Sequence, residues 1–346
     1  MNSPLKTPTF HPATYGGPHP LTTKPDIAQL LRTIREPMAA VESELRASMR
    51  SRDPFADALI GYGWSLGGKR LRPALVLLTS QALGSITEET RRLAVVVELV
   101  HTATLVHDDV LDGASYRRHV PTVHTQWDTH CSILLGDFLF TEAYYQASLC
   151  DSPLPSRLVG QAAKQLCEGE IRQRGTIDNW NLPVDQYLDI LRGKTAELCA
   201  VSTCLGAWSV KASPEAIQAA ERYGRNLGLA FQIFDDWLDL WGDDTTVGKS
   251  LGTDLVTGKP TLPILRLLET LDKDDRTEVM KILHGDAKQR LELLRPWLEK
   301  SDASQYTLEF AERYVSAAIS DLDCFPDSPE KTALELLARF SVSRQK

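Results

Sequence analysis

Residues 105–112 (LVHDDVLD) place three carboxylates within five positions of an otherwise apolar stretch. Aspartate is a poor helix former, and like charges four residues apart on a helix repel by about 0.2–0.5 kcal/mol. The same D-D-x-x-D spacing recurs far along the chain in residues 231–239 (FQIFDDWLD), again between apolar residues. One such cluster would be explained best as a solvated acidic surface, whereas two copies with apolar flanks favour a site that binds a cation.

Helix geometry predicts how these carboxylates are presented. Residues four apart share a helix face, so Asp108 and Asp112 point the same way, as do Asp235 and Asp239. The middle aspartate of each motif lies about 100° further round the helix. Ligands that are all oxygen predict a hard ion, Mg²⁺ first, which binds one or two carboxylates together with substrate phosphates. An EF-hand calcium site fits poorly because the loop glycine and the alternating ligands are absent.

Basic loops accompany both acidic motifs. Residues 67–73 (GGKRLRP) supply three cations after a glycine pair, and such a loop at the start of a helix favours anions. Residues 117–119 follow the first aspartate motif, while residues 248–249 and 258–261 follow the second. A lone basic loop would be explained as a solvated turn. Here acid, metal, phosphate and base can alternate around one cavity.

The elements that must position these groups are helices. Apolar residues recur at helical spacing in residues 91–112, 186–208 and 215–240, and turn signals separate these stretches. Strand-like alternation is scarce. We therefore expect an all-α protein of roughly ten or more helices. Residues 1–25 are predicted to be a flexible tail, and residues 26–346 a single domain because no Pro- or Ser-rich linker interrupts them.

Composition limits the possible functions. The 346 residues are 42% hydrophobic and 24% charged, which is ordinary for a globular protein, and the net charge of -8 argues against a general nucleic-acid surface. No apolar run approaches the ~18 residues of an integral membrane segment. The N-terminus lacks a signal-peptide apolar region and matches a transit peptide poorly. Six cysteines without a C-x-x-C pair predict buried, reduced thiols and a cytoplasmic location.

Seven motifs occur in order: GGKRLRP, LVHDDVLDGASYRR, GDFL, EGEIRQ, KTAEL, GLAFQIFDDWLD and GKSLGTDLVTGKPTLP. Together they closely resemble the trans-isoprenyl diphosphate synthases, the chain-elongating prenyltransferases, over about residues 60–265. The two aspartate motifs and GGKRLRP carry most of the specificity. The resemblance implies the isoprenoid synthase fold, a helical bundle around a central cavity. It also implies head-to-tail, trans (1′-4) condensation of isopentenyl diphosphate with an allylic diphosphate.

The resemblance assigns roles to individual residues. In the family, both aspartate motifs hold a cluster of three Mg²⁺ ions that grips the allylic diphosphate, and the matching ligands here are Asp108, Asp112 and Asp235, with Asp239 in support. The residues that match the allylic diphosphate site are Arg117, Lys194, Lys249 and Lys259. The residues that match the isopentenyl diphosphate site are Lys69, Arg72, His101 and Arg118. The residues expected near the reacting allyl group are Thr195, Gln232, Asp109 and Asp236.

The implied reaction is ionisation followed by condensation. Metal and cationic side chains stabilise the departing pyrophosphate, and the double bond of isopentenyl diphosphate attacks the resulting allylic cation. A proton is then lost from the condensed product. In the family the leaving pyrophosphate takes up this proton, so no side-chain base is required. The cation needs a dry, apolar cavity to escape capture by water.

Product length depends on the positions just before the first motif. Thr104 lies one turn before Asp108 on the same helix face, and Ala103 flanks it. Short-chain family members often carry a bulky aromatic residue at one of these positions. Both residues are small here, which favours a product of geranylgeranyl length or longer. Tyr144 and Tyr145 are expected to be ordinary core aromatics rather than the cavity floor.

Other functions are weighed against the same residues. A farnesyl diphosphate synthase differs in product length alone. A class I terpene cyclase usually has an Asn/Ser/Glu second motif and needs no isopentenyl diphosphate site. A non-catalytic partner subunit typically loses an aspartate motif, and a purely structural bundle leaves the doubled carboxylates unexplained. Family members are commonly homodimers, and we expect the same here by analogy.

Overall fold

The computed structural model describes residues 31–65, 67–242 and 251–343. The predicted tail, residues 1–25, lies outside these ranges. Within them the chain is almost wholly helical, so the all-α expectation is confirmed. In chain order the elements are the 3-10 turn η1 (Arg32–Ile34), α2 (Arg35–Ser48), α3 (Pro54–Ser65), α4 (Leu71–Leu83), α5 (Glu88–Leu111), β1 (Tyr116–Arg117), β2 (Val120–Pro121), α6 (Val123–Gln126), α7 (Thr129–Ser148), α8 (Leu154–Gly175), α9 (Val184–Leu191), the π-helical turn η2 (Arg192–Ala196), α10 (Glu197–Ser209), α11 (Pro214–Trp241), α13 (Thr253–Val256), α14 (Leu262–Thr270), α15 (Lys273–Leu283), the 3-10 turn η3 (Ala287–Gln289), α16 (Arg290–Lys300), α17 (Ala303–Asp321) and α18 (Pro329–Ser341).

The two helices that carry the aspartate motifs, α5 and α11, are strongly capped at their starts. Thr87 and Thr90 form a reciprocal capping box before α5, and the Ser213 hydroxyl accepts from the third residue of α11. Each motif falls at the last turn of its helix. The C-terminal end of a helix carries partial negative charge, so three further carboxylates there are unfavourable unless a cation offsets them.

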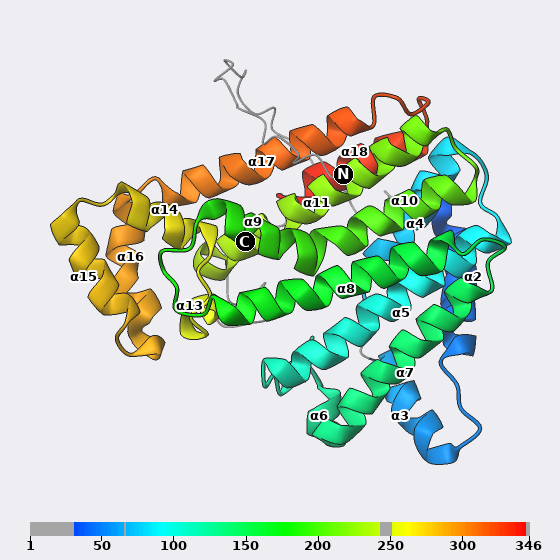
Figure 1. Ribbon diagram of the computed structural model, residues 1–346, viewed down its shortest axis with the longest axis horizontal. Coiled ribbons are helices and arrows are strands. Elements are labelled where there is room, and N and C mark those ends of the chain that lie inside the picture. Colours follow the sequence, from blue (N-terminus) through cyan, green and yellow to red (C-terminus); the bar gives the residue numbers. More distant parts are fainter. Residues whose placement is uncertain (1–30, 66, 243–250, 344–346) are drawn as a thin grey trace, which may run out of the picture.

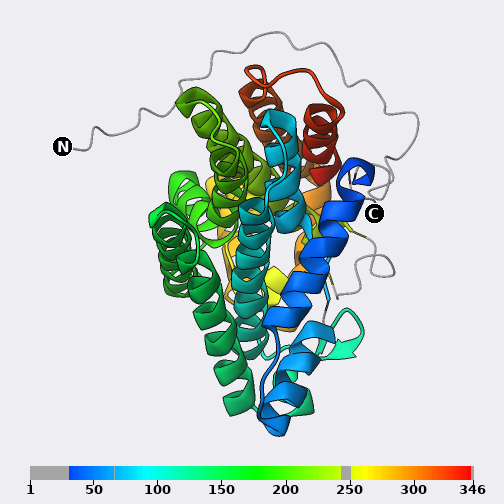
Figure 2. The same cartoon turned by 90° about the vertical axis from the view of Figure 1, so that its right-hand side faces the viewer.

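Helix α5 forms the centre of the bundle. Its middle, residues 93–100, is buried on all sides, and the helix packs against α2, α4, α7 and α10. The end-on view shows α5 with α2 on one side and α7 on the other (Figure 2). Helix α11 packs against α10 and α17. A second apolar cluster around Trp180 and Leu255 lies at the end of the molecule formed by α13, α15 and α16 (Figure 1).

The basic loop after the first motif is a β-hairpin, which the sequence did not indicate. Strands β1 and β2 pair antiparallel, with Arg117 opposite Val120. Arg118 and His119 occupy the two-residue turn with φ of 52° and 66°, the backbone of a tight hairpin turn. This turn directs the guanidinium of Arg118 to the carbonyl oxygen of Gly67, 2.8 Å away.

Two expectations about side-chain burial need correction. Tyr144 and Tyr145 are 39% and 59% exposed on α7, so they are not core aromatics. Their face of α7 points away from α5 because the helix turns Leu135 and Leu139 into the core instead. All six cysteines are free, as expected, but Cys167 and Cys324 are exposed rather than buried.

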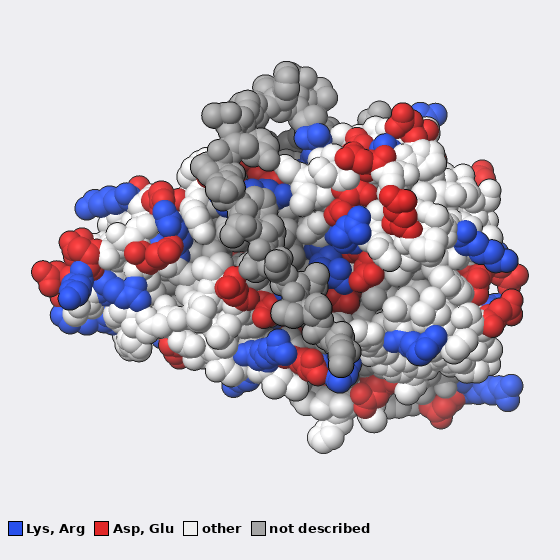
Figure 3. Space-filling view, turned by 45° about the horizontal axis from the view of Figure 1, so that its top comes forward, with Lys and Arg blue, Asp and Glu red and all other residues white. Residues whose placement is uncertain are grey.

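The described surface carries charges of both signs. Lys and Arg side chains are interspersed with Asp and Glu over the described part of the face in Figure 3. Separately, none of the described helices combines the length and apolarity that crossing a bilayer requires.

Candidate active site

The first aspartate motif divides its three side chains between two tasks. Asp112 is exposed, with 54% of its side chain accessible, and Asp108 is half-buried. Burial, together with the charges of Glu170 and Asp112, raises the pKa of Asp108 to about 6. Asp109 is turned into the protein, is 1% exposed, and forms an ion pair of 2.8 Å with Arg117. Asp109 therefore holds the start of the basic hairpin against α5.

The second motif shows the same division. Asp235 is half-buried on the face that it shares with Asp239. The carboxylate of Asp239 accepts from the backbone N–H groups of Thr253 and Asp254, each at 3.1 Å, and so caps α13. Burial, followed by the charge of Asp254, raises the pKa of Asp239 to about 7. The middle residue, Asp236, is 4% exposed and turned inward.

A lysine from the loop after the second motif reaches the first motif. The ammonium of Lys259 lies 3.6 Å from Asp254 and 4.0 Å from Asp112. The segment before Lys259 is held by buried Arg290, whose guanidinium donates a hydrogen bond to the carbonyl oxygen of Leu255 at 2.7 Å. The structure therefore brings the two aspartate motifs to the same region, with a cation between them.

The second bridging cation, Lys194, comes from the π-helical turn η2. Its ammonium lies 2.7 Å from Glu170 and donates to Gln173 at 2.9 Å, so η2 is tied to α8. The backbones of α8 and η2 approach closely at Gly169 and Gly193. A Cβ added to Gly169 would lie 2.7 Å from the backbone nitrogen of Lys194. A π-turn inside a helix is often found at functional sites because it redirects side chains. Here it directs Lys194 toward the aspartates.

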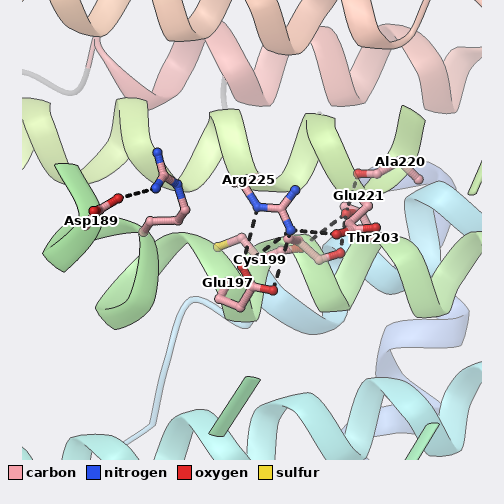
Figure 4. Close-up of polar contacts among 9 residues, drawn as sticks. Asp189, Glu197, Cys199, Thr203, Ala220, Glu221 and Arg225 are labelled. Atoms are coloured by element: carbon pink, nitrogen blue, oxygen red, sulfur yellow. Dashed lines mark hydrogen bonds and ion pairs between the residues drawn. The ribbon is translucent and has the colours of Figure 1, made fainter. Parts of the chain in front are cut away.

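A partly exposed ion network holds the other side of η2. Arg225 of α11 lies 2.6 Å from Glu221 and 3.4 Å from Glu197, the first residue of α10 (Figure 4). Thr203 donates to the carbonyl of Ala220 and ties the same two helices together (Figure 4). Because α10 begins directly after η2, this network fixes the end of the turn that carries Lys194.

Three of the four residues expected near the reacting allyl group are hydrogen-bonded to one another, whereas the fourth, Asp109, pairs with Arg117 instead. The Thr195 hydroxyl donates to the side-chain oxygen of Gln232 at 2.9 Å, and the Gln232 amide donates to Asp236 at 3.1 Å. The Tyr187 hydroxyl donates to the other oxygen of Asp236 at 2.7 Å. A cavity of about 60 Å³ runs along this line, and its walls include Lys194, Gln232, Asp236, Asp254 and Lys259.

All four residues of the predicted isopentenyl diphosphate group line a second cavity of about 140 Å³. They are Lys69, Arg72, His101 and Arg118. The buried Nε of Arg72 has no hydrogen-bond partner among the described residues, which suits an incoming anion. Burial, then the charges of nearby arginines, lowers the pKa of His101 well below its ordinary value, so this histidine is neutral. The apolar side of the cavity includes Phe231.

The third cation of GGKRLRP has a different place. Arg70 adopts a left-handed φ of 49° and turns toward the core, where its guanidinium bonds Glu42 at 2.7 Å and Glu98 at 2.8 Å. It also lies 4.8 Å from the centre of the Trp64 ring. Arg70 thus anchors the loop through its two ion pairs, although it still borders the cavity that Lys69 and Arg72 line.

Sequence reasoning missed several residues of this site. Glu170 and Gln173 fall inside EGEIRQ, and Asp254 falls inside the last motif, so their motif positions were available signals. Tyr187 and Glu98 carried no signal, because their roles depend on contacts between distant parts of the chain. Predicted Lys249 lies outside the described residues.

The donor set fits a hard divalent ion. The outward carboxylates supply oxygen alone, and the raised pKa values of Asp108 and Asp239 show negative charge held in a poorly solvated region. Among the described residues, no three acidic, histidine or cysteine side chains converge closely enough to enclose a metal. Water and diphosphate oxygens would complete the coordination of a magnesium-type ion held by these carboxylates.

Comparisons with known proteins agree with this geometry. Residues 53–297 match the family model described as polyprenyl synthetase. The chain is 35% identical over 284 residues to the short chain isoprenyl diphosphate synthase of Methanothermobacter thermautotrophicus, covering 81% of this chain and 87% of that protein. It is 31% identical to the octaprenyl diphosphate synthase of Escherichia coli, covering 89% and 96%.

A solved structure shows the same fold. The polyprenyl synthase of Caulobacter crescentus, described as complexed with calcium and isoprenyl diphosphate, superposes with a TM-score of 0.86 at 34% identity. The match covers 94% of this chain and 99% of that one. The expected isoprenoid synthase fold and chain-elongating prenyl transfer are confirmed, and the chain belongs to the polyprenyl synthetase family of trans-isoprenyl diphosphate synthases.

Proposed function

We propose that this prenyltransferase condenses isopentenyl diphosphate with an allylic diphosphate, in a Mg²⁺-dependent reaction, to give a product of geranylgeranyl length or longer. The observation that carries the proposal is the presence of two separate cation-lined cavities. One contains Lys69 and Arg72, and the other contains Lys194 and Lys259 between the aspartate motifs. Condensation of two diphosphates requires two anion sites, whereas a class I cyclase requires one.

The side chains have distinct tasks in this proposal. Asp108, Asp112 and Asp235 would hold Mg²⁺, three ions per site in the family pattern, and this metal would supply Lewis-acid stabilisation of the departing pyrophosphate. Lys194 and Lys259 stabilise the negative charge that develops on that pyrophosphate. The raised pKa values near the aspartates indicate a poorly solvated site, where such charges interact strongly.

The isopentenyl diphosphate is held from the opposite side. Lys69, Arg72 and Arg118 offer donors for its two phosphates, and neutral His101 can donate one hydrogen bond without adding charge. This arrangement leaves the apolar wall at Phe231 beside the carbon skeleton, where it excludes water from the allylic cation.

Product length is proposed from the residues beneath Asp108. Ala103 is fully buried and Thr104 is 7% exposed, so a larger side chain at either position would occupy space inside the bundle. Thr104→Phe should therefore shorten the product, and Ala103→Phe should shorten it as well. The matched control is Thr277→Phe, at an exposed position of α15 remote from the site, which should leave product length unchanged. An unchanged product from both buried variants would contradict the proposed path of the growing chain.

One assay tests the activity itself. Purified protein, Mg²⁺, labelled isopentenyl diphosphate and a panel of allylic primers should yield labelled polyprenyl diphosphates, whose length is read by chromatography after dephosphorylation. The named relatives differ in product class, from short-chain to octaprenyl, so farnesyl-length product is the main alternative. Absence of label from every product would refute elongation and support a cyclase instead.

We propose a homodimer that assembles through α7. Its solvent-facing side carries Ile133, Leu134 and Tyr145, which are 43%, 64% and 59% exposed, and a second copy of the chain would cover them. The single domain over residues 26–346 is also proposed, because the site draws side chains from α4 through α18. A reducing, cytoplasmic location is proposed from the six unpaired cysteines.

A further inference from the structure

Tyr187 stands at the far end of the hydrogen-bonded line that crosses the allylic cavity. The line runs from Tyr187 on α9 to Asp236 and Gln232 on α11, and then to Thr195 on η2, with lengths of 2.7, 3.1 and 2.9 Å. Tyr187 is 3% exposed, and its hydroxyl has no role in the chemistry described above.

The order of donors and acceptors along this line fixes the orientation of each group. Tyr187 occupies Oδ2 of Asp236, and the amide of Gln232 turns its NH₂ toward Oδ1 of the same residue, 3.1 Å away. Its oxygen then faces Thr195 and accepts the hydroxyl hydrogen of that residue. The lone pairs of the Thr195 oxygen are thereby left for the allyl group that is expected beside this residue.

That orientation matters for a reaction that forms a carbocation. An oxygen lone pair that faces the allylic carbon stabilises the developing positive charge, whereas a hydroxyl hydrogen in the same place opposes it. Without the Tyr187 hydroxyl, Asp236 keeps one described side-chain donor instead of two, and its buried second oxygen loses a partner. The carboxylate is then free to rotate, and the amide of Gln232 rotates with it.

We propose that Tyr187 is a positioning residue for prenyl transfer: by holding Asp236 it fixes the Gln232 amide, and so keeps the Thr195 hydroxyl hydrogen directed away from the allylic cation. The inference rests on the proposed function, since it assigns Tyr187 to the ionisation step of that reaction. It concerns orientation rather than affinity, because the Tyr187 hydroxyl donates to Asp236 and makes no hydrogen bond to a phosphate-binding lysine or arginine among the described residues.

The chain offers a matched control for the loss of a buried tyrosine hydroxyl. Tyr223 is fully buried, and its hydroxyl donates at 2.8 Å to the carbonyl of Leu334, away from both cavities. Tyr223→Phe therefore removes a hydrogen bond of the same kind without touching the line. Tyr187→Phe and Tyr223→Phe should lower the melting temperature by similar amounts, whereas Tyr187→Phe alone should lower kcat, by about tenfold.

A double-mutant cycle separates positioning from a general structural role. Tyr187→Phe should leave both KM values within twofold of wild type, and it should change kcat less than twofold when Thr195 is already valine. Turnover is normalised to active sites counted with a non-ionisable thiolodiphosphate analogue of the allylic substrate, so partial misfolding of a variant does not lower the measured rate. Thr195→Ser, which keeps the hydroxyl, should retain at least half of the wild-type kcat.

Each outcome is decisive. Additive losses in the cycle, a rise in KM without a change in kcat, or equal kcat for the two phenylalanine variants would overturn the role of Tyr187 while leaving the proposed function intact. A wild-type protein that incorporates no isopentenyl diphosphate would refute the proposed function, and this inference with it.

Discussion

The contact between Gly169 and η2 gives the sharpest test of how the site is built. Gly169→Ala adds a Cβ 2.7 Å from the backbone nitrogen of Lys194 and 3.1 Å from the carbonyl carbon of Gly193. Ordinary contact begins at 3.4 Å, so η2 and α8 must separate by about 0.7 Å at this point. Both neighbours are backbone atoms, and no flexible side chain can move aside to absorb the shift.

The expected cost follows from two opposing terms. Overpacking in a well-packed interior costs about 1–3 kcal/mol, while replacing a helical glycine by alanine returns roughly 0.5–1 kcal/mol. The two terms together predict a fall in the free energy of unfolding of about 0–2.5 kcal/mol, centred on roughly 1 kcal/mol. A shift of this size also moves Lys194 relative to the aspartates, and misplacement by ~1 Å costs about a hundredfold in rate. We expect kcat/KM for the allylic diphosphate to fall roughly ten- to a hundredfold, with little change in KM for isopentenyl diphosphate.

Gly175→Ala is the matched control, because Gly175 ends the same helix and has nothing within 4 Å of an added Cβ. Urea unfolding and steady-state kinetics with the allylic substrate varied give both quantities. The control should stay within about 0.5 kcal/mol and twofold in activity. If Gly169→Ala proved as stable and as active as the control, the close approach would not be positioning Lys194.

Two further predictions concern metal and assembly. Burial raises the pKa of Asp108 to about 6 and of Asp239 to about 7, so in metal-free protein their contribution to stability is present at acidic pH and is lost as pH rises through 6 to 7. Excess Mg²⁺ offsets that charge and should raise the melting temperature more at pH 8 than at pH 5.5, and an equal or opposite dependence would contradict the assignment. Leu134→Asp should convert the proposed homodimer to a monomer in analytical ultracentrifugation, whereas Leu293→Asp, at a position 48% exposed on α16, should not. A wild-type monomer, or a dimeric Leu134→Asp variant, would count against the α7 interface.

The long helices were readable from sequence because their signals are local. Helices α5 and α11 have capped starts, sustained apolar periodicity and an aspartate motif at the end. The hairpin at residues 116–121 was not readable, because two-residue strands carry no alternation and its turn uses Arg118 and His119 rather than glycine or asparagine.

The candidate site was predictable where residues belong to motifs and unpredictable where partners are distant. Helix geometry set the middle aspartates apart from their neighbours, but it gave no sign that Asp109 pairs with Arg117 or that Asp236 pairs with Tyr187, 49 residues away. Likewise, GGKRLRP presented three equivalent cations, and tertiary packing alone turned Arg70 toward Glu98. Such pairings are decided by packing between elements, which one sequence does not encode locally.

The carboxylate of Asp239 has a consequence for mutagenesis of the second motif. This carboxylate accepts hydrogen bonds from the backbone N–H groups of Thr253 and Asp254. An amide at position 239 would therefore disturb the anchorage of the segment that presents Lys259. Loss of turnover in Asp239→Asn would therefore combine two lesions, one in ion affinity and one in loop placement. Asp235 and Asp239 should not be compared as interchangeable probes of metal number.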